Sequence, residues 1–541
     1  MARNLITASF AGSTPRRAEH LTPNGQAVVA LDCRLSDGSL DSWREPRQID
    51  TVPANTKSVY QAFNCCWLQS TKCASWAEGS VDQRHVFATQ YNDFDYPVRI
   101  VLGEMCEPTV LRLGLPCPAE RIVATAAATF NKGSAPRQYL FQFEDSLGNL
   151  SAASEPSDAV VVQEGASVQL SGWAVPTGGW DIQKIRIYRS VAGTETTPFQ
   201  ESGNKIDSAW MLVDTIPASQ ASYTDSKFDA DLIDALAEDE VEPPPAGLRG
   251  MTWIRTMNCL AGFVGRELFF TENNNYHNWA YKIKLDDTVK ALCEVNDRIY
   301  VATDGAPYMV PAAVNCENAG CRQAVRMPES LPLVGGGFRS MIALPSGAIY
   351  PTHSGLVYMS GNRAPAILTA KHYAPEDWQA LHPDTAKLGY HEGLVFAFFR
   401  KGAFCLAVQD GAGTAAETEQ HTELSLRPDE VFTSRLGRLY LRFGTDVKEW
   451  NRGVAKMPHR YESGESLAGV PFNFGAAQVL MELGTETVQV FVDGDEALNE
   501  TIFKNEHFPL PMWATGQEWR WVLTGTANVK MVGLAPSTKE L

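Results

Sequence analysis

Hydrophobic and polar positions return in one short pattern between residues 253 and 450. A small apolar run is followed by a tight turn, a second apolar or aromatic run, another turn and a third run. Alternation bounded by turn residues predicts β-hairpins. Five instances occur, at residues 260–270, 292–302, 342–350, 388–398 and 432–441.

The spacing of these hairpins points to one architecture. Their inner turns centre near Gly265, Asp297, Gly347, Gly393 and Gly437, so the unit recurs every 32 to 50 residues. Hairpins at this spacing, extended to three or four strands per unit, are typical of β-propeller blades. We therefore predict an all-β fold built on an irregular β-propeller, with most of its blades in residues 248–455.

The region before this frame is predicted to hold a further blade and an arm. Residues 58–63, 85–89 and 96–101 read as strands, and we assign residues 58–118 to the first propeller blade. Residues 1–57 are polar and turn-rich. We expect them to form an N-terminal arm that adds a strand to a later blade, closing the ring, or reaches a neighbouring subunit.

Residues 119–228 have a different character. Short alternating strands are predicted at 139–143, 158–162, 167–171, 185–189 and 210–214, with the spacing of a seven-stranded sandwich. The runs LGNLSAASEP (147–156), IYRS (187–190) and YTD (223–225) resemble a fibronectin type III domain. We expect an inserted domain of this type.

Two segments follow the predicted insertion and the predicted propeller. Residues 229–247 hold seven carboxylates and then Pro243, Pro244 and Pro245, and we interpret them as an exposed, stiff linker. Residues 456–541 again alternate and are predicted to form a C-terminal β-sandwich. Only 375–381 and 231–236 look helical.

Composition limits the possible functions. Hydrophobic residues make up 44% and charged residues 20% of the 541, as in ordinary folded proteins. The 46 basic and 63 acidic residues give a net charge of −17, with no basic block. Sequence-specific or tight nucleic-acid binding is therefore not expected, because it needs clustered Lys and Arg.

The compartment is predicted from the first residues and the cysteines. The N-terminus lacks the apolar region of a signal peptide, and no apolar run is long enough to span a membrane. Eleven cysteines stand at irregular spacing. We expect free, mostly buried thiols in a protein made in a reducing cytoplasm.

Motifs for catalysis or metal binding are weak. Cys316 and Cys321 could be half of a metal site, but no second Cys or His pair has suitable spacing, so two buried thiols are favoured. Asp493-Gly494-Asp495 resembles the start of a calcium loop, yet the glycine is misplaced and a plain hairpin turn is favoured. We predict no enzymatic activity, no catalytic residue, no cofactor and no metal.

Propellers can also be glycosidases that gather carboxylates over their axis. The candidates here are Asp304, Glu376, Asp377 and Glu392, and none lies in the blade-turn motif of sialidase-type propellers. Histidines near turns are expected at the surface: His20, His85, His277, His353 and His391. Ten tryptophans are expected in cores rather than on carbohydrate platforms: Trp173, Trp180, Trp210, Trp253, Trp279, Trp378, Trp450, Trp513, Trp519 and Trp521.

A set of segments, taken in order, resembles a group of tailed-bacteriophage virion proteins. The set comprises LRGMTW (248–253), CLAGFVG (259–265), FTE (270–272), HNW (277–279), TDGAPYMV (303–310), SGLVY (354–358), YAPEDWQAL (373–381), FGAAQV (474–479), WRW (519–521) and STKEL (537–541). The named family that this order resembles is the short-tail phage nozzle, or tail tubular protein B. The likeness covers most of residues 120–541, although this chain is shorter than the best-known nozzles.

The resemblance implies a homohexameric ring at the end of the tail tube, in the virion, assembled in the host bacterial cytoplasm. The partners it implies are further copies of the chain, a tail adaptor or portal-side tail protein, tail fibres or spikes, and genomic DNA that passes without sequence-specific binding. An acidic conduit suits that passage because like charges repel. The alternative is a glycan-binding or glycan-degrading phage adhesin, similar to a tailspike, which would use the aromatic residues.

Overall fold

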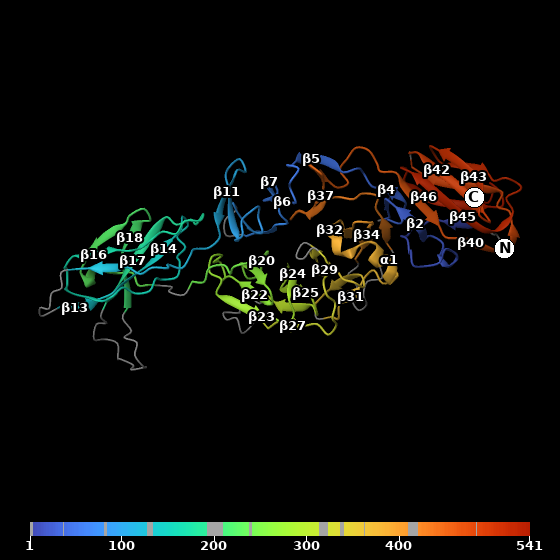
Figure 1. Cartoon of the computed structure of the whole chain (residues 1–541). Helices are drawn as coiled ribbons and strands as arrows, with labels where there is room; N and C mark the ends of the chain where they lie inside the picture. The colour runs from blue at the N-terminus through green and yellow to red at the C-terminus, as the bar shows by residue number, and fades with distance from the viewer. Residues whose placement is uncertain are drawn as a thin grey trace. The chain divides into compact units, whose positions relative to one another are not determined.

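The computed structural model describes residues 4–35, 37–79, 84–126, 134–191, 209–236, 241–312, 323–335, 340–361, 363–408, 420–482 and 484–541. Strands make up almost all of its regular structure, so the all-β prediction is confirmed (Figure 1). The chain divides into two compact units. Unit 1 comprises Met1–Cys73, Asp287–Pro311 and Ala324–Leu541, and unit 2 comprises Ala74–Asp286 and Ala312–Gln323.

Unit 1 contains a series of four-stranded antiparallel meanders. The first two sheets are β24 (Val289–Val295), β25 (Arg298–Thr303), β26 (Tyr308–Pro311) and β27 (Val325–Arg326), then β28 (Ile342–Leu344), β29 (Gly347–Pro351), β30 (Leu356–Met359) and β31 (Ala366–Ile367). The next strands in order are β32 (Lys387–His391), β33 (Leu394–Phe398), β34 (Ala403–Ala407) and β35 (His421–Glu423). The last sheet is β36 (Glu430–Thr433), β37 (Leu439–Phe443), β38 (Asp446–Glu449) and β5 (Arg47–Thr51).

Consecutive meanders of unit 1 bury their faces against each other. Tyr300 of β25 and Tyr350 of β29 belong to one core, and Ile349 of β29 shares the next core with Val395 of β33. Phe396 of β33 and Leu441 of β37 belong to a third. Alternation explains this arrangement, because successive side chains of a strand point to opposite faces and each face here is covered by a neighbouring sheet.

The N-terminal segment is part of several sheets. β5 supplies the fourth strand beside β38, as our interpretation of the arm expected. β1 (Leu5–Thr7) pairs with the last strand of the chain, and β2 (Ala27–Leu31) joins β35 on one side to β39 on the other. The remaining elements are η1 (Glu19–Leu21), the pair β3 (Cys33–Arg34) and β4 (Asp41–Ser42), and the hairpin of β6 (Ser58–Ala62) and β7 (Cys66–Ser70).

Two sheets pack around one core at the C-terminal end of unit 1. Strands β39 (His459–Ser463), β40 (Ser466–Phe472), β42 (Glu486–Val492), β43 (Asp495–Ile502) and β45 (Gly516–Gly525) continue β32–β35 and β2 into one ten-stranded sheet. The opposite sheet is β1, β46 (Val529–Ala535), β41 (Ala476–Met481) and β44 (Glu506–Pro509). Val490 and Trp521 from the first sheet meet Val479 and Leu534 from the second. The sandwich predicted for residues 456–541 therefore includes N-terminal strands.

Unit 2 contains two further four-stranded meanders that share a core. They are β8 (Ser75–Glu78), β9 (His85–Thr89), β10 (Val98–Leu102) and β11 (Pro108–Arg112), and β20 (Arg249–Ile254), β21 (Cys259–Val264), β22 (Glu267–Phe270) and β23 (Tyr281–Lys284). Phe87 of β9 packs with Trp253 of β20 and Leu260 of β21. The span 58–118, expected to be one blade, holds both the hairpin β6–β7 and this first meander.

The predicted inserted domain is a set of small sheets around one core. Its strands are β12 (Val123–Thr125), β13 (Ser134–Arg137), β14 (Tyr139–Glu144), β15 (Val160–Gln163), β16 (Val168–Ser171), β17 (Lys184–Val191), β18 (Ala209–Pro217) and β19 (Ser222–Asp225). They pair as β12-β16-β19, β13-β15 and β14-β17-β18. Phe141, Leu170 and Ile187 meet in the core. The described residues thus form eight strands in three sheets, where seven strands were expected.

The five predicted hairpins are all present, as β21–β22, β24–β25, β28–β29, β32–β33 and β36–β37. The turn between β32 and β33 shows why the sequence was informative. Glu392 and Gly393 have φ values of 48° and 82°, and two successive left-handed residues are what a two-residue hairpin requires.

One of the two predicted helices needs correction. The helix at 375–381 is confirmed as α1 (Pro375–Ala380), but residues 231–236 are not helical. A 3-10 turn, η2 (Asp229–Asp231), ends there, and Ala235 instead bridges to Met211. The other short helix is η5 (Pro383–Thr385). Among described residues, no helix is long and apolar enough to cross a membrane.

The thiols also differ from expectation. Cys33, Cys259 and Cys405 are buried and free, but Cys65, Cys73 and Cys117 are free and exposed, and Cys293 is partly exposed. Cys66 and Cys106 are disulfide-bonded, so the prediction of free thiols is wrong for these two.

Candidate functional site

A pocket of about 170 Å³ lies between the N-terminal segment and the sheet of β32–β35 in unit 1. Arg34 and Trp43 line it from the N-terminal side, and Glu392, Cys405 and Gln420 line it from the sheet. Of the four candidate carboxylates in the sequence, only Glu392 belongs to this pocket. Arg34 and Trp43 were not predicted, because nothing in their local pattern distinguishes them from other residues of a turn-rich arm.

Charge in this pocket is internally balanced. Nη2 of Arg34 lies 3.3 Å from Oε2 of Glu392, and the Arg34 guanidinium stands 5.3 Å from the centre of the Trp43 ring. The charged side chains are 34% and 47% exposed, so solvent screens the pair and it contributes little to stability. Glu392 is thus one member of a charged pair, and it is the one carboxylate that lines this pocket.

The pocket thiols are poorly suited to nucleophilic chemistry. Burial raises the pKa of Cys405 to about 12, and burial raises the pKa of Cys33 well above its usual value. Sγ of Cys405 lies 3.0 Å from Oγ1 of Thr422, and Sγ of Cys33 donates to the carbonyl oxygens of Leu31 and Arg460. Both thiols stay protonated at neutral pH, whereas attack requires a thiolate.

The other candidate carboxylates stand on separate exposed elements. Asp304 follows β25, and Glu376 and Asp377 form the first turn of α1. Slight burial of Asp304 by itself would raise the pKa of its carboxyl group. Hydrogen bonding from Thr288 outweighs this effect and lowers the pKa of Asp304. No hydrogen bond or ion pair joins any two of the four candidates in the described chain. A glycosidase needs two facing carboxylates about 5–10 Å apart, and the pocket is lined by one.

Ser42, His459 and Glu486 form a line of hydrogen bonds that resembles a catalytic triad. Oγ of Ser42 lies 2.8 Å from Nδ1 of His459, and Nε2 of His459 lies 3.1 Å from Oε1 of Glu486. His459 and Glu486 are fully buried, and Ser42 is 3% exposed. No substrate reaches such a serine, so the line is a buried polar network that ties β4 to β39 and β42.

A second buried histidine anchors the N-terminal segment. Oγ of Ser13 lies 3.0 Å from Nδ1 of His421, and the Tyr373 hydroxyl lies 2.8 Å from Nε2. The ring of His372 stacks on His421 at 4.8 Å. Burial and then the neighbouring His372 hold the pKa of His421 well below its usual value. A neutral imidazole with both nitrogens engaged serves as a structural bridge.

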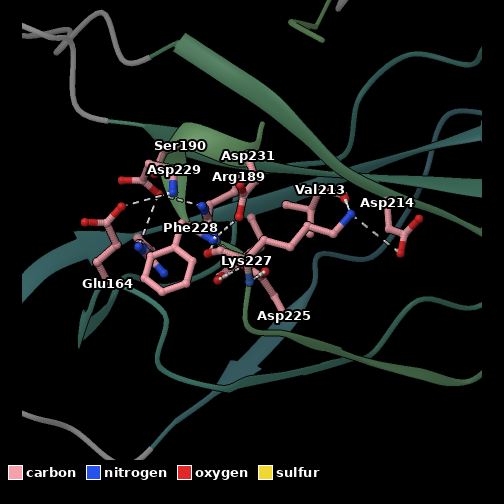
Figure 2. A network of polar contacts seen from close by, with 12 residues as sticks. Glu164, Arg189, Ser190, Val213, Asp214, Asp225, Lys227, Phe228, Asp229 and Asp231 are labelled. Carbon is pink, nitrogen blue, oxygen red and sulfur yellow. Dashed lines mark hydrogen bonds and ion pairs between the residues drawn. The ribbon is translucent and has the colours of Figure 1, made fainter. Parts of the chain in front are cut away.

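In unit 2, a buried ion network closes one end of the inserted domain, and Figure 2 shows it. Nη1 of Arg189 lies 2.6 Å from Oδ2 of Asp225, and Nη2 lies 2.5 Å from Oδ1 of Asp229. Arg137 also binds Asp229, at 3.1 Å. The Tyr139 hydroxyl donates to Asp225 at 2.9 Å. Asp229 belongs to the acidic run interpreted as a solvated linker, and at this residue the interpretation is wrong.

A second network in unit 2 joins the inserted domain to the meander β8–β11. Nη1 of Arg99, on β10, lies 3.3 Å from Asp145 and 2.9 Å from the Tyr276 hydroxyl, and Nη2 binds Asp181. Arg112 lies 3.9 Å from the centre of the Trp180 ring. These contacts fix the turn after β14 and the segment before β17 to the meander. Arg99 and Arg112 are engaged in these contacts within unit 2 rather than directed toward a ligand.

The remaining sequence candidates are placed as follows. His20 and His353 are exposed, whereas His85, His277 and His391 are buried, so their prediction as surface residues is wrong. Asp493 and Gly494 form the β42–β43 turn, with φ of 48° and 87°, and the hairpin prediction is confirmed. Cys316 and Cys321 lie outside the described residues. Most of the tryptophans are in cores as predicted, namely Trp173, Trp253, Trp279, Trp378, Trp450, Trp519 and Trp521; Trp180 and Trp210 are half-buried, and Trp513 is exposed.

Comparisons with known proteins place the chain in no family. No protein-family model and no curated protein matches it. One similar solved structure is Hsv2 of Kluyvelomyces marxianus, with 11% identity, coverage of 51% of this chain and 68% of that chain, and a TM-score of 0.24. A second is PorZ of the Porphyromonas gingivalis type-IX secretion system, with 10% identity, coverage of 82% of this chain and 66% of that chain, and a TM-score of 0.25. A third is the extracellular domain of BT4673 from B. thetaiotaomicron, with 10% identity, coverage of 87% of this chain and 73% of that chain, and a TM-score of 0.24. Likenesses at these TM-scores support no argument about function.

Proposed function

We propose that the chain is a structural component of a bacteriophage tail, a ring-forming protein of the nozzle or tail-tube class. In this proposal the four-stranded meanders are blades of an irregular β-propeller, and the inserted and C-terminal β-domains are platforms for neighbouring tail proteins. The ordered segments at 248–310, 354–381 and 474–541 carry the resemblance that motivates the assignment.

The observation that carries the proposal is the run of meanders packed face to face. β24–β27, β28–β31, β32–β35 and β36–β38 with β5 follow one another in sequence and share successive cores. Four-stranded sheets that pack in sequence order are the blade arrangement of propellers, which surround a central channel. Completion of the last of these sheets by β5 from the other end of the chain resembles the closure that such rings use.

The buried polar groups support a mechanical rather than a chemical role. In the described residues, the serine–histidine–glutamate line is sealed from solvent and the pocket is lined by one carboxylate that is already paired. The glycan-degrading alternative finds less support in these features. A conduit for DNA would also benefit from the net charge of −17, because like charges keep the genome from adhering.

Native mass spectrometry and electron microscopy of the purified protein test the proposal. We expect a closed ring of about six copies, the number that the resemblance implies; head-to-tail contacts form such a ring when the rotation per copy closes it. We also expect the chain in purified virions of the phage that encodes it, detected by peptide mass spectrometry. A protein that stays monomeric at high concentration and is absent from virions would overturn the proposal.

A further inference from the structure

Three arginines converge on one buried carboxylate at the end of the sheet β36–β37–β38–β5. Oε2 of Glu449 lies 3.0 Å from Nη2 of Arg47. Oε1 lies 3.5 Å from Nε of Arg452 and 3.8 Å from Nη1 of Arg438. The Glu449 side chain is 5% exposed, whereas the three arginine side chains are 49–59% exposed. We call these three residues the arginine patch.

The backbone builds this patch. Glu449 lies directly opposite Arg47 in the β38–β5 ladder and opposite Tyr440 in the β37–β38 ladder. Arg438 lies two residues before Tyr440, directly before β37 begins. Arg452 follows Glu449 by three residues. Arg47 lies on β5, Arg438 directly precedes β37 and Arg452 follows β38, so three guanidinium groups surround one carboxylate and these four side chains together carry two more positive than negative charges. In a chain of net charge −17, such a local excess of positive charge is unusual.

Exposed apolar side chains flank the patch. Leu436, in the β36–β37 turn that ends at Arg438, is 59% exposed, and Val454, two residues after Arg452, is 96% exposed. Arginine is enriched in protein interfaces and forms many of their energetically important contacts.

The same unit carries a surface of opposite charge on another sheet. β43 is the terminal strand of the ten-stranded sheet and exposes Asp495, Glu496 and Glu500. The Glu496 carboxylate accepts hydrogen bonds from the neutral amides of Gln489 and Asn499, which hold it in place without neutralising it. Charged residues on an edge strand discourage the addition of another strand. The exposed carboxylates of this edge complement a surface that carries cations.

We propose that the arginine patch of one copy of the chain binds the acidic β43 edge of the next copy. The proposal rests on the proposed ring and names the contact that would hold it together. Because the two surfaces are different parts of one unit, the contact is head-to-tail, and head-to-tail contacts close into rings when the rotation per copy allows it. Arginine forks on carboxylates give such a contact its direction.

Charge variants of the full chain test the contact by sedimentation velocity and mass photometry. Arg438→Gln with Arg452→Gln removes the excess charge, and Glu496→Lys with Glu500→Lys reverses the edge. Each is expected to weaken association by at least ~10-fold, and wild-type association is expected to weaken as salt rises. Lys401→Glu with Lys539→Glu, at exposed positions of the same unit, is the matched control and should leave association unchanged.

A mixing experiment adds specificity. Arg438→Glu with Arg452→Glu gives a chain whose patch is acidic, and Glu496→Lys with Glu500→Lys gives a chain whose β43 edge is basic. Each of these two reversed chains alone should stay dissociated. Mixed in equal amounts, the two reversed chains should form rings, because every contact then pairs opposite charges. If the Glu variants fail to fold beside Glu449, as thermal melting would show, the Gln variants alone decide the result.

The outcomes separate the two proposals. Wild-type rings that both double variants leave intact would overturn the arginine-patch contact while the proposed ring stands. A wild-type chain that never associates would overturn the proposed ring and the contact with it. Rings lost in each variant and restored by mixing would establish the contact.

Discussion

Arg189 and Asp225 are both fully excluded from solvent, and Nη1 of the arginine lies 2.6 Å from Oδ2 of the aspartate. Asp229 reaches the same guanidinium from the start of the acidic run (Figure 2). Strand β17, the end of strand β19 and the segment that follows it are therefore joined through the buried Arg189 guanidinium. The domain is fixed to its exit segment at this point.

Removing one partner of this pair should destabilise the inserted domain strongly. Asp225→Asn leaves a buried guanidinium short of a counter-charge, and we expect a loss of about 3–5 kcal/mol. Hydrogen exchange of β14 and β17 measures the loss locally, which matters because a chain with several domains does not unfold in one step. Asp158→Asn is the matched control: Asp158 pairs with Arg121 at 3.1 Å, but both side chains are exposed, so less than about 1 kcal/mol is expected. Equal effects of the two substitutions would contradict the conclusion that the buried Arg189–Asp225 pair stabilises the inserted domain.

Acid should loosen unit 2 through His277. Burial lowers the pKa of His277 to about 4, against about 6.5 in an unfolded chain. The unfolded state therefore binds more protons between these values, and stability is lost as the pH falls from about 6.5 to about 4, by about 3 kcal/mol in all. Hydrogen exchange in β20–β23 across this range measures it. His277→Gln removes the titration, and a variant with the same acid loss as the wild type would refute the assignment to this residue.

Much of the local structure could be predicted from the sequence, and the long-range pairing could not. The five hairpins were predictable because strand alternation and turn residues such as Gly393 and Gly437 lie within a few residues of one another. The partners of β1 and β2 lie hundreds of residues away, and nothing near these short strands in the sequence indicates them. The arm was expected to add a strand to a later blade, as β5 does, but the sequence did not indicate that β38 would be its partner. Ala235 shows the opposite failure. A segment with helical periodicity became extended because its neighbour at Met211 offered a bridge.

Candidate site residues were harder to predict for a similar reason. Whether a histidine is buried depends on which sheet covers its strand. His85 and His391 lie near turns, and the sequence around them did not indicate that they would be buried. Ser42, His459 and Glu486 meet from three distant segments, so their hydrogen-bonded line has no sequence motif. Seven of the ten tryptophans lie in cores as predicted, because large aromatic side chains bury a large area where strands end.

The line of Ser42, His459 and Glu486 should be structural and unreactive. Glu486→Gln replaces the charged acceptor of His459 by a neutral one in a fully buried site, so we expect a loss of stability of about 1.5–3 kcal/mol, measured by hydrogen exchange of β42 and β45. Glu482→Gln, whose carboxylate is 65% exposed and 3.6 Å from Lys530, should change stability by less than about 1 kcal/mol. A fluorophosphonate probe should not label Ser42 in the folded chain. Labelling that disappears in Ser42→Ala would show instead that the serine is accessible and activated.

The pairing of β5 with β38 should hold the end of the meander series together. The register is regular at Asp50 and Thr51, where successive N–H groups point to opposite sides, so Asp50→Pro with Thr51→Pro must remove at least one donor to β38 and should detach β5. We expect the amides of Val447 and Lys448 to lose protection from hydrogen exchange, and the freed edge to cause concentration-dependent aggregation. Leu5→Pro with Ile6→Pro, the same change in β1, should instead expose amides of β46 and leave β38 protected. If the β5 variant leaves β38 as protected as in the wild type, the N-terminal segment does not close this sheet.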